Sequence, residues 1–116
     1  MKTLKEIYID LLTRLYKETL EGIKRTNSGV QRAKMLRETV NCFSFGIYSE
    51  LTEGEEQERL REMHTELLIR AYTEGIKVAE KISDPAEKVD FLHDLVLFYS
   101  FRNSKDIVLE ERKTAR

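Results

Sequence analysis

The sequence lacks several features that mark specialised classes of protein: among its 116 residues are one cysteine, one proline and no tryptophan. A single cysteine, Cys42, excludes an internal disulfide and a zinc site built from several cysteines. The longest apolar runs are a few residues, whereas a membrane-spanning helix needs roughly 20. Residues 1–6 pass directly into an amphipathic pattern, without the apolar core of a signal peptide. We therefore expect a cytoplasmic protein with no membrane partner.

An excess of charge is also absent, because 20 Lys and Arg residues stand against 21 Asp and Glu residues. Without a basic surplus, the composition argues against a nucleic-acid partner. The five glycines are isolated, so there is no glycine-rich phosphate loop. At 41% hydrophobic and 35% charged residues, the chain has the composition of one folded domain.

What the sequence does contain is helical periodicity, and the longest predicted helix covers residues 52–82. Thr52 and Glu55 have the spacing of a capping box, in which the two side chains satisfy backbone N–H groups at the helix start. Apolar residues then recur at three- and four-residue steps, the period of one helix face. A helix of this length is roughly 45 Å long, so its apolar stripe needs several partner helices.

Three more helices are predicted from their caps and apolar spacing. Two of them, residues 3–25 and residues 28–51, each begin at a hydroxyl residue with Glu or Gln three positions later. The last begins at Asp84, with Pro85 in its first turn. It carries two apolar stripes, a predicted core seam and a second stripe beside it: Val89, Leu92, Val96 and Tyr99, then Phe91, Leu95, Phe98 and Phe101.

A spacing of 56 residues relates the two halves of the chain. The pattern L-L-x-R-x-Y-x-E begins at Leu11 and again at Leu67, and 67 − 11 = 56. The same offset aligns caps and seams: Ser28 with Asp84, Leu36 with Leu92, Val40 with Val96, and Phe43 with Tyr99. A duplicated helical hairpin and a chance match between two Leu- and Glu-rich hairpins both explain the pattern. Either way, we predict an all-α, antiparallel four-helix bundle over residues 1–104, followed by a charged tail or short helix over residues 105–116.

Candidate catalytic and metal-binding residues are few. His64 and His93 are the only histidines, and Asp90 precedes His93 by three positions on one helix face. A carboxylate-bridged dimetal bundle needs Glu-x-x-His on two helices, and the sequence has no such pair. Cys42 has no neighbouring histidine, so we read it as a packed residue rather than a nucleophile. We expect no cofactor, no metal and no enzymatic activity.

A nuclease is a distant alternative. Arg59 and His64 have the R-x4-H spacing of small helical RNases of the higher-eukaryote and prokaryote nucleotide-binding type. Residues 101–103 (Phe-Arg-Asn) also resemble the start of that motif, but no histidine follows them. The two partial matches therefore lie in different places.

Aromatic residues are the remaining signal, because several of the five Tyr and five Phe residues lie beside the predicted seams. These are Phe45, Tyr48, Phe91, Phe98 and Phe101. Such residues either thicken the core or leave an apolar groove that takes a partner helix or a second copy of the chain.

One segment resembles a known family. Residues 11–23 read L-L-x-x-L-Y-x-x-x-L-x-x-I, similar to the first long helix of the flagellin-specific flagellar secretion chaperones. Residues 48–54 are similar to the S-L-D-x-x-x-G turn between two long helices of that family. The S-P dipeptide before the Leu-Leu pair is missing, and residues 60–67 depart from the I-A-x-N-L-x-x-L-Y run. The resemblance implies a cytosolic four-helix bundle that holds the C-terminal segment of flagellin in apolar grooves.

The sequence therefore predicts a non-enzymatic protein-binding module, a secretion chaperone for flagellin or another exported helical protein. The resemblance implies that Leu11, Leu15 and Tyr16 line or support the partner-binding groove. The aromatic residues beside the seams add Phe45, Tyr48, Phe98 and Phe101 to the predicted partner-binding residues. A structural homo-oligomer, such as a homodimer, is the alternative function, and a small helical RNase or metal-binding bundle is more distant.

Overall fold

The computed structural model describes residues 2–43 and 45–98, and every regular element in this part of the chain is a helix. The helices are α1 (Leu4–Arg25), α2 (Gly29–Cys42), α3 (Phe45–Leu51), α4 (Gly54–Glu80) and α5 (Pro85–Phe98). Phe101 and the predicted tail, residues 105–116, lie outside the described residues. No helix in the described ranges is long and apolar enough to cross a membrane.

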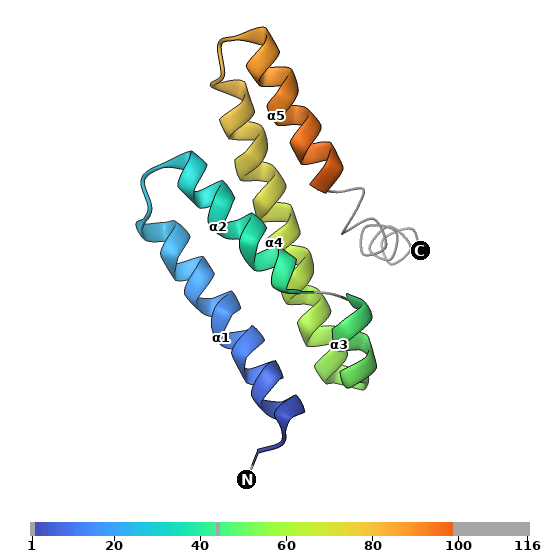
Figure 1. The fold of residues 1–116 in the computed structure, drawn as a ribbon. Coiled ribbons are helices and arrows are strands. Elements are labelled where there is room, and N and C mark those ends of the chain that lie inside the picture. Colours follow the sequence, from blue (N-terminus) through green and yellow to red (C-terminus); the bar gives the residue numbers. More distant parts are fainter. Residues whose placement is uncertain (1, 44, 99–116) are drawn as a thin grey trace.

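The long helices alternate in direction along the molecule (Figure 1). The pair α2 and α4 forms the most extensive contact, and α1 and α5 lie on opposite sides of this pair (Figure 1). The short helix α3 packs against the first part of α4. The all-α fold is therefore confirmed for the described residues, while the four-helix bundle stays a prediction.

Three of the predicted helix starts are confirmed by side-chain caps. In each, a side-chain oxygen accepts from the backbone N–H three residues later, as N-caps do. The bonds join Thr3 to Glu6 (3.2 Å), Ser28 to Gln31 (3.3 Å) and Asp84 to Glu87 (2.9 Å).

The predicted cap at Thr52 is wrong. Its hydroxyl donates to the carbonyl of Tyr48 at 2.6 Å, so Thr52 closes α3 instead of opening α4. The N-cap of α4 is Glu53, which makes no side-chain cap bond. Gly54 begins α4 with a φ of 63°, a backbone conformation that glycine adopts without steric cost.

The predicted helix over residues 28–51 is divided into α2 and α3. Phe43 leaves the helix with extended backbone angles, and its ring stacks on His64 with centroids 5.8 Å apart. In one continuous helix, Tyr48 would lie about 120° around the axis from Leu36. The break therefore lets Phe43 and Tyr48 both enter the core, where each is buried.

The predicted seam of α5 is also wrong. Leu95, from the second stripe, is buried, whereas Val89, Leu92 and Val96 are exposed. A Cβ added to Gly75 of α4 would lie 2.8 Å from Leu95 Cδ2, so the missing side chain is what admits Leu95. Both stripes of α5 are apolar, and this close approach decides which one faces α4.

Candidate interaction surface

The outer side of α1 carries an apolar stripe that no described residue covers. Leu4, Ile7 and Leu11 are all exposed, and their three- and four-residue spacing places them on one helix face. Another face of α1 supplies the core with Ile9 and Leu12. A helix with two apolar faces, of which one meets solvent, is typical of an interaction surface.

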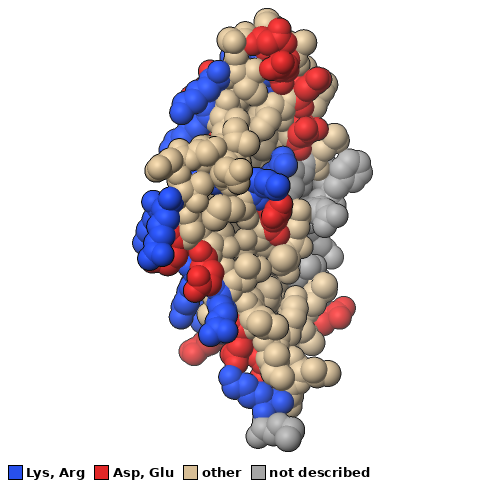
Figure 2. Space-filling model, turned by 60° about the vertical axis from the view of Figure 1, so that its left-hand side comes forward, with Lys and Arg blue, Asp and Glu red and all other residues tan. Residues whose placement is uncertain are grey.

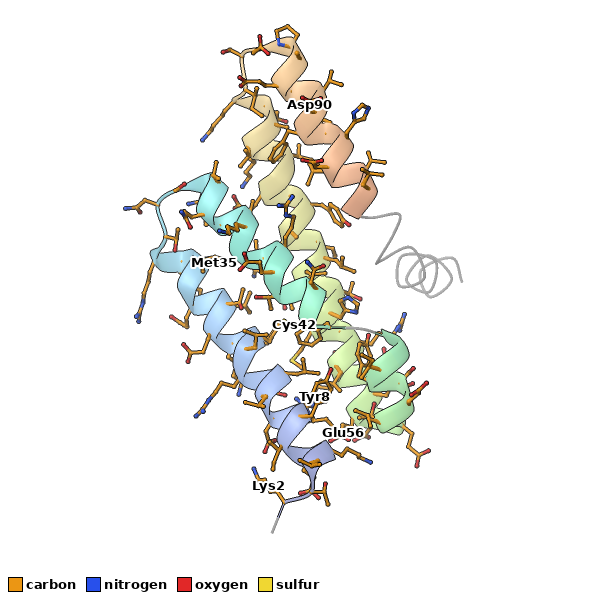
Figure 3. All side chains as sticks on the ribbon, in the orientation of Figure 1. Lys2, Tyr8, Met35, Cys42, Glu56 and Asp90 are labelled. Atoms are coloured by element: carbon orange, nitrogen blue, oxygen red, sulfur yellow. The ribbon has the colours of Figure 1, made fainter. Side chains whose placement is uncertain are left out.

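Hollows in the surface border this stripe. One, of about 600 Å³, is lined by Ile7 and Leu11 together with charged residues of α1 such as Arg14. Another, of about 380 Å³, lies between α1 and α2 and is lined by Leu15 and Met35. Met35 lies between these two helices (Figure 3). Figure 2 brings the α1 side forward and shows mostly uncharged surface down its middle, interrupted by a few charged side chains. Lys and Arg side chains gather along the left edge, with Asp and Glu side chains among them.

The predicted partner-binding residues of α1 occupy three different environments. Leu11 is exposed on the stripe and Leu15 is half-buried at its edge. Tyr16 instead packs against the core and donates its hydroxyl to the carboxylate of Glu66 on α4. Tyr16 therefore anchors α1 rather than facing a partner directly.

The Tyr16–Glu66 bond shifts both ionisation equilibria. Burial, followed by the bond to Glu66, raises the pKa of Tyr16 to about 12. The Tyr16 hydroxyl, followed by Arg70, lowers the pKa of Glu66 below its ordinary value. Arg70 donates to Glu66 through two nitrogens at 3.0 and 3.1 Å. At neutral pH the site is thus a charged, hydrogen-bonded link between α1 and α4.

The prediction for Tyr48 is wrong. Its ring is fully buried, and its hydroxyl lies 3.2 Å from His64 Nδ1. Placement in the core follows from the helix break before α3, which turns Tyr48 inward. Phe45 lies in α3 and Phe98 at the end of α5, but their side chains are outside the described part, as is the whole of Phe101.

The residues considered for catalysis do not converge. His64 is buried between Phe43 and Tyr48, while Arg59 is exposed and donates to Thr13 of α1 at 3.3 Å. The R-x4-H spacing therefore does not form an accessible pair. Asp90 and His93 are exposed on α5, and Asp90 is labelled in Figure 3. Within residues 2–43 and 45–98, no group of three or more His, Cys, Asp or Glu residues is arranged to hold a metal ion.

Cys42 is not the packed residue that the sequence suggested. It is exposed at the end of α2, and its thiol donates to the carbonyl of Glu38 at 3.5 Å.

A second apolar stripe was not predicted as a surface. Val89, Leu92 and Val96 of α5 are exposed on one face. The signal was present in the sequence, because α5 carries two apolar stripes and packs mainly on α4. A helix with two apolar stripes and one main partner helix buries one stripe and leaves the other exposed.

Comparisons with known proteins add no relative. No protein-family model matches the sequence, and no curated protein and no solved structure is significantly similar to it. The resemblance to flagellar secretion chaperones therefore stays a prediction.

Proposed function

We propose that this chain is a non-enzymatic protein-binding module that takes a helix of another polypeptide on the outer face of α1. The observation that carries the proposal is the exposed stripe of Leu4, Ile7 and Leu11. Burying side chains of this size contributes about 1.5–3 kcal/mol each, before the costs of association and ordering are subtracted. A helix that presents its own apolar face at the same spacing fits this surface best.

The half of α1 that follows the stripe is tied to α2 and α4, which favours binding. Tyr16 bonds to Glu66, and the hydroxyls of Thr19 and Thr39 bond at 2.8 Å in the buried contact between α1 and α2. A surface fixed before binding loses less conformational entropy when the partner arrives. These bonds fix the position of α1, the helix that carries the stripe, on the rest of the fold.

The more specific form of the proposal is a cytoplasmic secretion chaperone built as a helical bundle, with flagellin or another exported helical protein as its partner. Its basis is the resemblance of residues 11–23 to the flagellar chaperones, together with the exposure of Leu11. Capture would cover an apolar segment that otherwise aggregates, opposed by the entropy of ordering it.

The test is calorimetry of the purified chain with a peptide from the C-terminal segment of flagellin. We expect a dissociation constant in the micromolar range or below and a negative heat-capacity change, the mark of apolar burial. Leu11→Glu should abolish the binding. Ile47→Glu is the matched control, since Ile47 is similarly exposed but lies on α3.

Tyr16→Glu would be a poor probe, because it places a carboxylate beside Glu66 and weakens the link between α1 and α4. If Leu11→Glu and wild type bind the peptide equally, the α1 face is not the site. If the folded protein binds no flagellin peptide, the specific chaperone proposal fails.

A further inference from the structure

The two halves of the chain repeat a packing contact as well as a sequence pattern. Thr19 and Thr39 touch between α1 and α2, and Gly75 and Leu95 touch between α4 and α5. These positions correspond, because 75 − 19 and 95 − 39 both equal 56. Within each hairpin, α1 with α2 and α4 with α5, the two helices therefore contact each other through equivalent residues.

The most extensive contact between the two hairpins is the one between α2 and α4, and the Tyr16–Glu66 bond adds a smaller contact between α1 and α4. Leu36 and Val40 of α2 lie in the same core cluster as Leu67 of α4. Arg32 and Glu74 form an ion pair across it, with Nε and Oε2 3.2 Å apart. In repeat proteins, such stacking buries the apolar face that one unit cannot bury alone.

Each of the two apolar stripes that form this central contact has a counterpart 56 positions away that is exposed on the surface. The α2 stripe consists of Ala33, Leu36 and Val40, and each of these residues is at most 8% exposed. Their counterparts 56 positions later on α5 are Val89, Leu92 and Val96, which are 41–61% exposed. The α4 stripe is also at most 8% exposed, while its α1 counterparts are 43–85% exposed. These pairs are Leu60 and Leu4, Met63 and Ile7, and Leu67 and Leu11.

The ion pair of the central contact has counterparts as well. Arg32 corresponds to Lys88 of α5, and Glu74 corresponds to Glu18 of α1. The signs are kept, so Lys88 on one edge of the molecule complements Glu18 on the other. In apolar pattern and in charge, the outer face of α5 is complementary to the outer face of α1, as α2 is to α4.

We propose that copies of this chain associate head to tail, with α5 of one copy packing on α1 of the next as α2 packs on α4. The inference names the partner of the α1 face and so rests on the proposed function. A contact between two different faces is heterologous, and it repeats until the assembly closes into a ring or grows into a filament.

The test is sedimentation velocity on the full chain across a wide range of concentrations. The wild-type mass should rise with concentration, whereas Leu11→Glu and Leu92→Glu should each remain monomeric. Each variant keeps one intact face, so an equimolar mixture of the two should form a heterodimer and stop there. Ile47→Glu should assemble like the wild type.

Two outcomes overturn the inference. The first is a wild-type chain that stays monomeric at every concentration, as when residues 99–116 of the same chain cover the α5 face. The second is an assembling wild type whose two variants do not pair, which indicates a symmetric contact instead. Circular dichroism checks that each variant is folded, and the rescue in the mixture shows that both remain competent to bind.

Failure of this inference is separable from failure of the proposed function. Leu92→Glu keeps the α1 face intact, so the flagellin peptide can be titrated into this variant without competition from self-association. Peptide binding with no assembly overturns only the head-to-tail contact. If the peptide does not bind and no assembly forms, both the specific chaperone proposal and the head-to-tail contact fall.

Discussion

At the scale of the residue, Tyr16 shows why an aromatic side chain in a promising motif need not face a partner. Its position in the L-L-x-x-L-Y pattern suggested a groove residue, but the structure turns it toward α4. Its hydroxyl and Arg70 both donate to Glu66. Glu66 and Arg70 lie four positions apart on α4, but Tyr16 precedes Glu66 by 50 positions. Nothing in the sequence shows that α1 and α4 bring Tyr16 beside this pair.

Tyr16→Phe should lower the free energy of unfolding by about 1 kcal/mol at neutral pH. Hydrogen bonds to charged groups contribute somewhat more than this when buried, and partial exposure of Glu66 reduces the value. Urea unfolding followed by circular dichroism measures it. Tyr8→Phe is the control, because Tyr8 is also partly buried on α1 but has no side-chain hydrogen bond to a described residue.

The pH dependence of this variant is a more specific readout. Since the fold lowers the pKa of Glu66, the resulting stability is present above its ordinary pKa of 4.5 and is lost as the pH falls through the folded value. Removing the Tyr16 hydroxyl removes the largest cause of that shift. The difference between the variant and the wild type should therefore shrink in acid. A difference that stays constant from neutral pH into acid would show that the lost stability comes from packing.

At the scale of the element, the caps were predictable and the choice of buried face was not. Ser28 and Asp84 cap their helices because the cap depends only on residues within one turn. The prediction for Thr52 is wrong because its hydroxyl donates to the carbonyl of Tyr48 on the preceding helix. The α5 seam failed because Leu92 and Leu95 are both apolar, and periodicity does not choose between them.

Glycines decide how closely the helices approach, and the two hairpins should respond differently to alanine. At Gly75, the new methyl group would meet three atoms of buried Leu95, at 2.8, 3.2 and 3.6 Å. The whole side chain must then move. We expect Gly75→Ala to destabilise the protein by about 1 kcal/mol or more, despite the better helix propensity of alanine.

Gly22→Ala is the matched comparison. Its methyl group would meet only the terminal Cε of Met35, at 2.7 Å, and the flexible methionine can move aside. The variant should be neutral, or more stable by up to about 1 kcal/mol. Thermal unfolding of both variants gives the comparison. Equal effects at the two positions would mean that Leu95 does not fix the distance between α4 and α5.

At the scale of the whole molecule, the 56-residue offset links the core to the surface. The same pattern that is buried between α2 and α4 is exposed on α5 and α1, at opposite sides of the fold (Figure 1). Sequence periodicity identified the stripes but not which of them are covered. That depends on the packing, in which α1 lies mainly on α2 with a smaller contact to α4, and α5 lies mainly on α4. Among the long helices, α2 and α4 therefore have neighbours on both sides.

Charge reversal at Glu18 and Lys88 tests that relation without touching the apolar stripes. In the head-to-tail contact these residues correspond to the Glu74–Arg32 ion pair. Glu18→Lys or Lys88→Glu alone places like charges together. Either change should weaken association by roughly fivefold, since partly exposed pairs contribute about 1 kcal/mol or less.

The double variant carries the reversed pair in every contact, so its association should return to nearly the wild-type strength. Sedimentation at low ionic strength measures these changes, and added salt should reduce the differences because it screens exposed charges. Asp90→Lys is the control, since Asp90 is exposed on α5 but corresponds to Lys34, a surface residue outside the central stripe. If the double variant associates no better than the single variants, Glu18 and Lys88 do not pair between copies. The α1 face and the α5 face would then not be in contact as proposed.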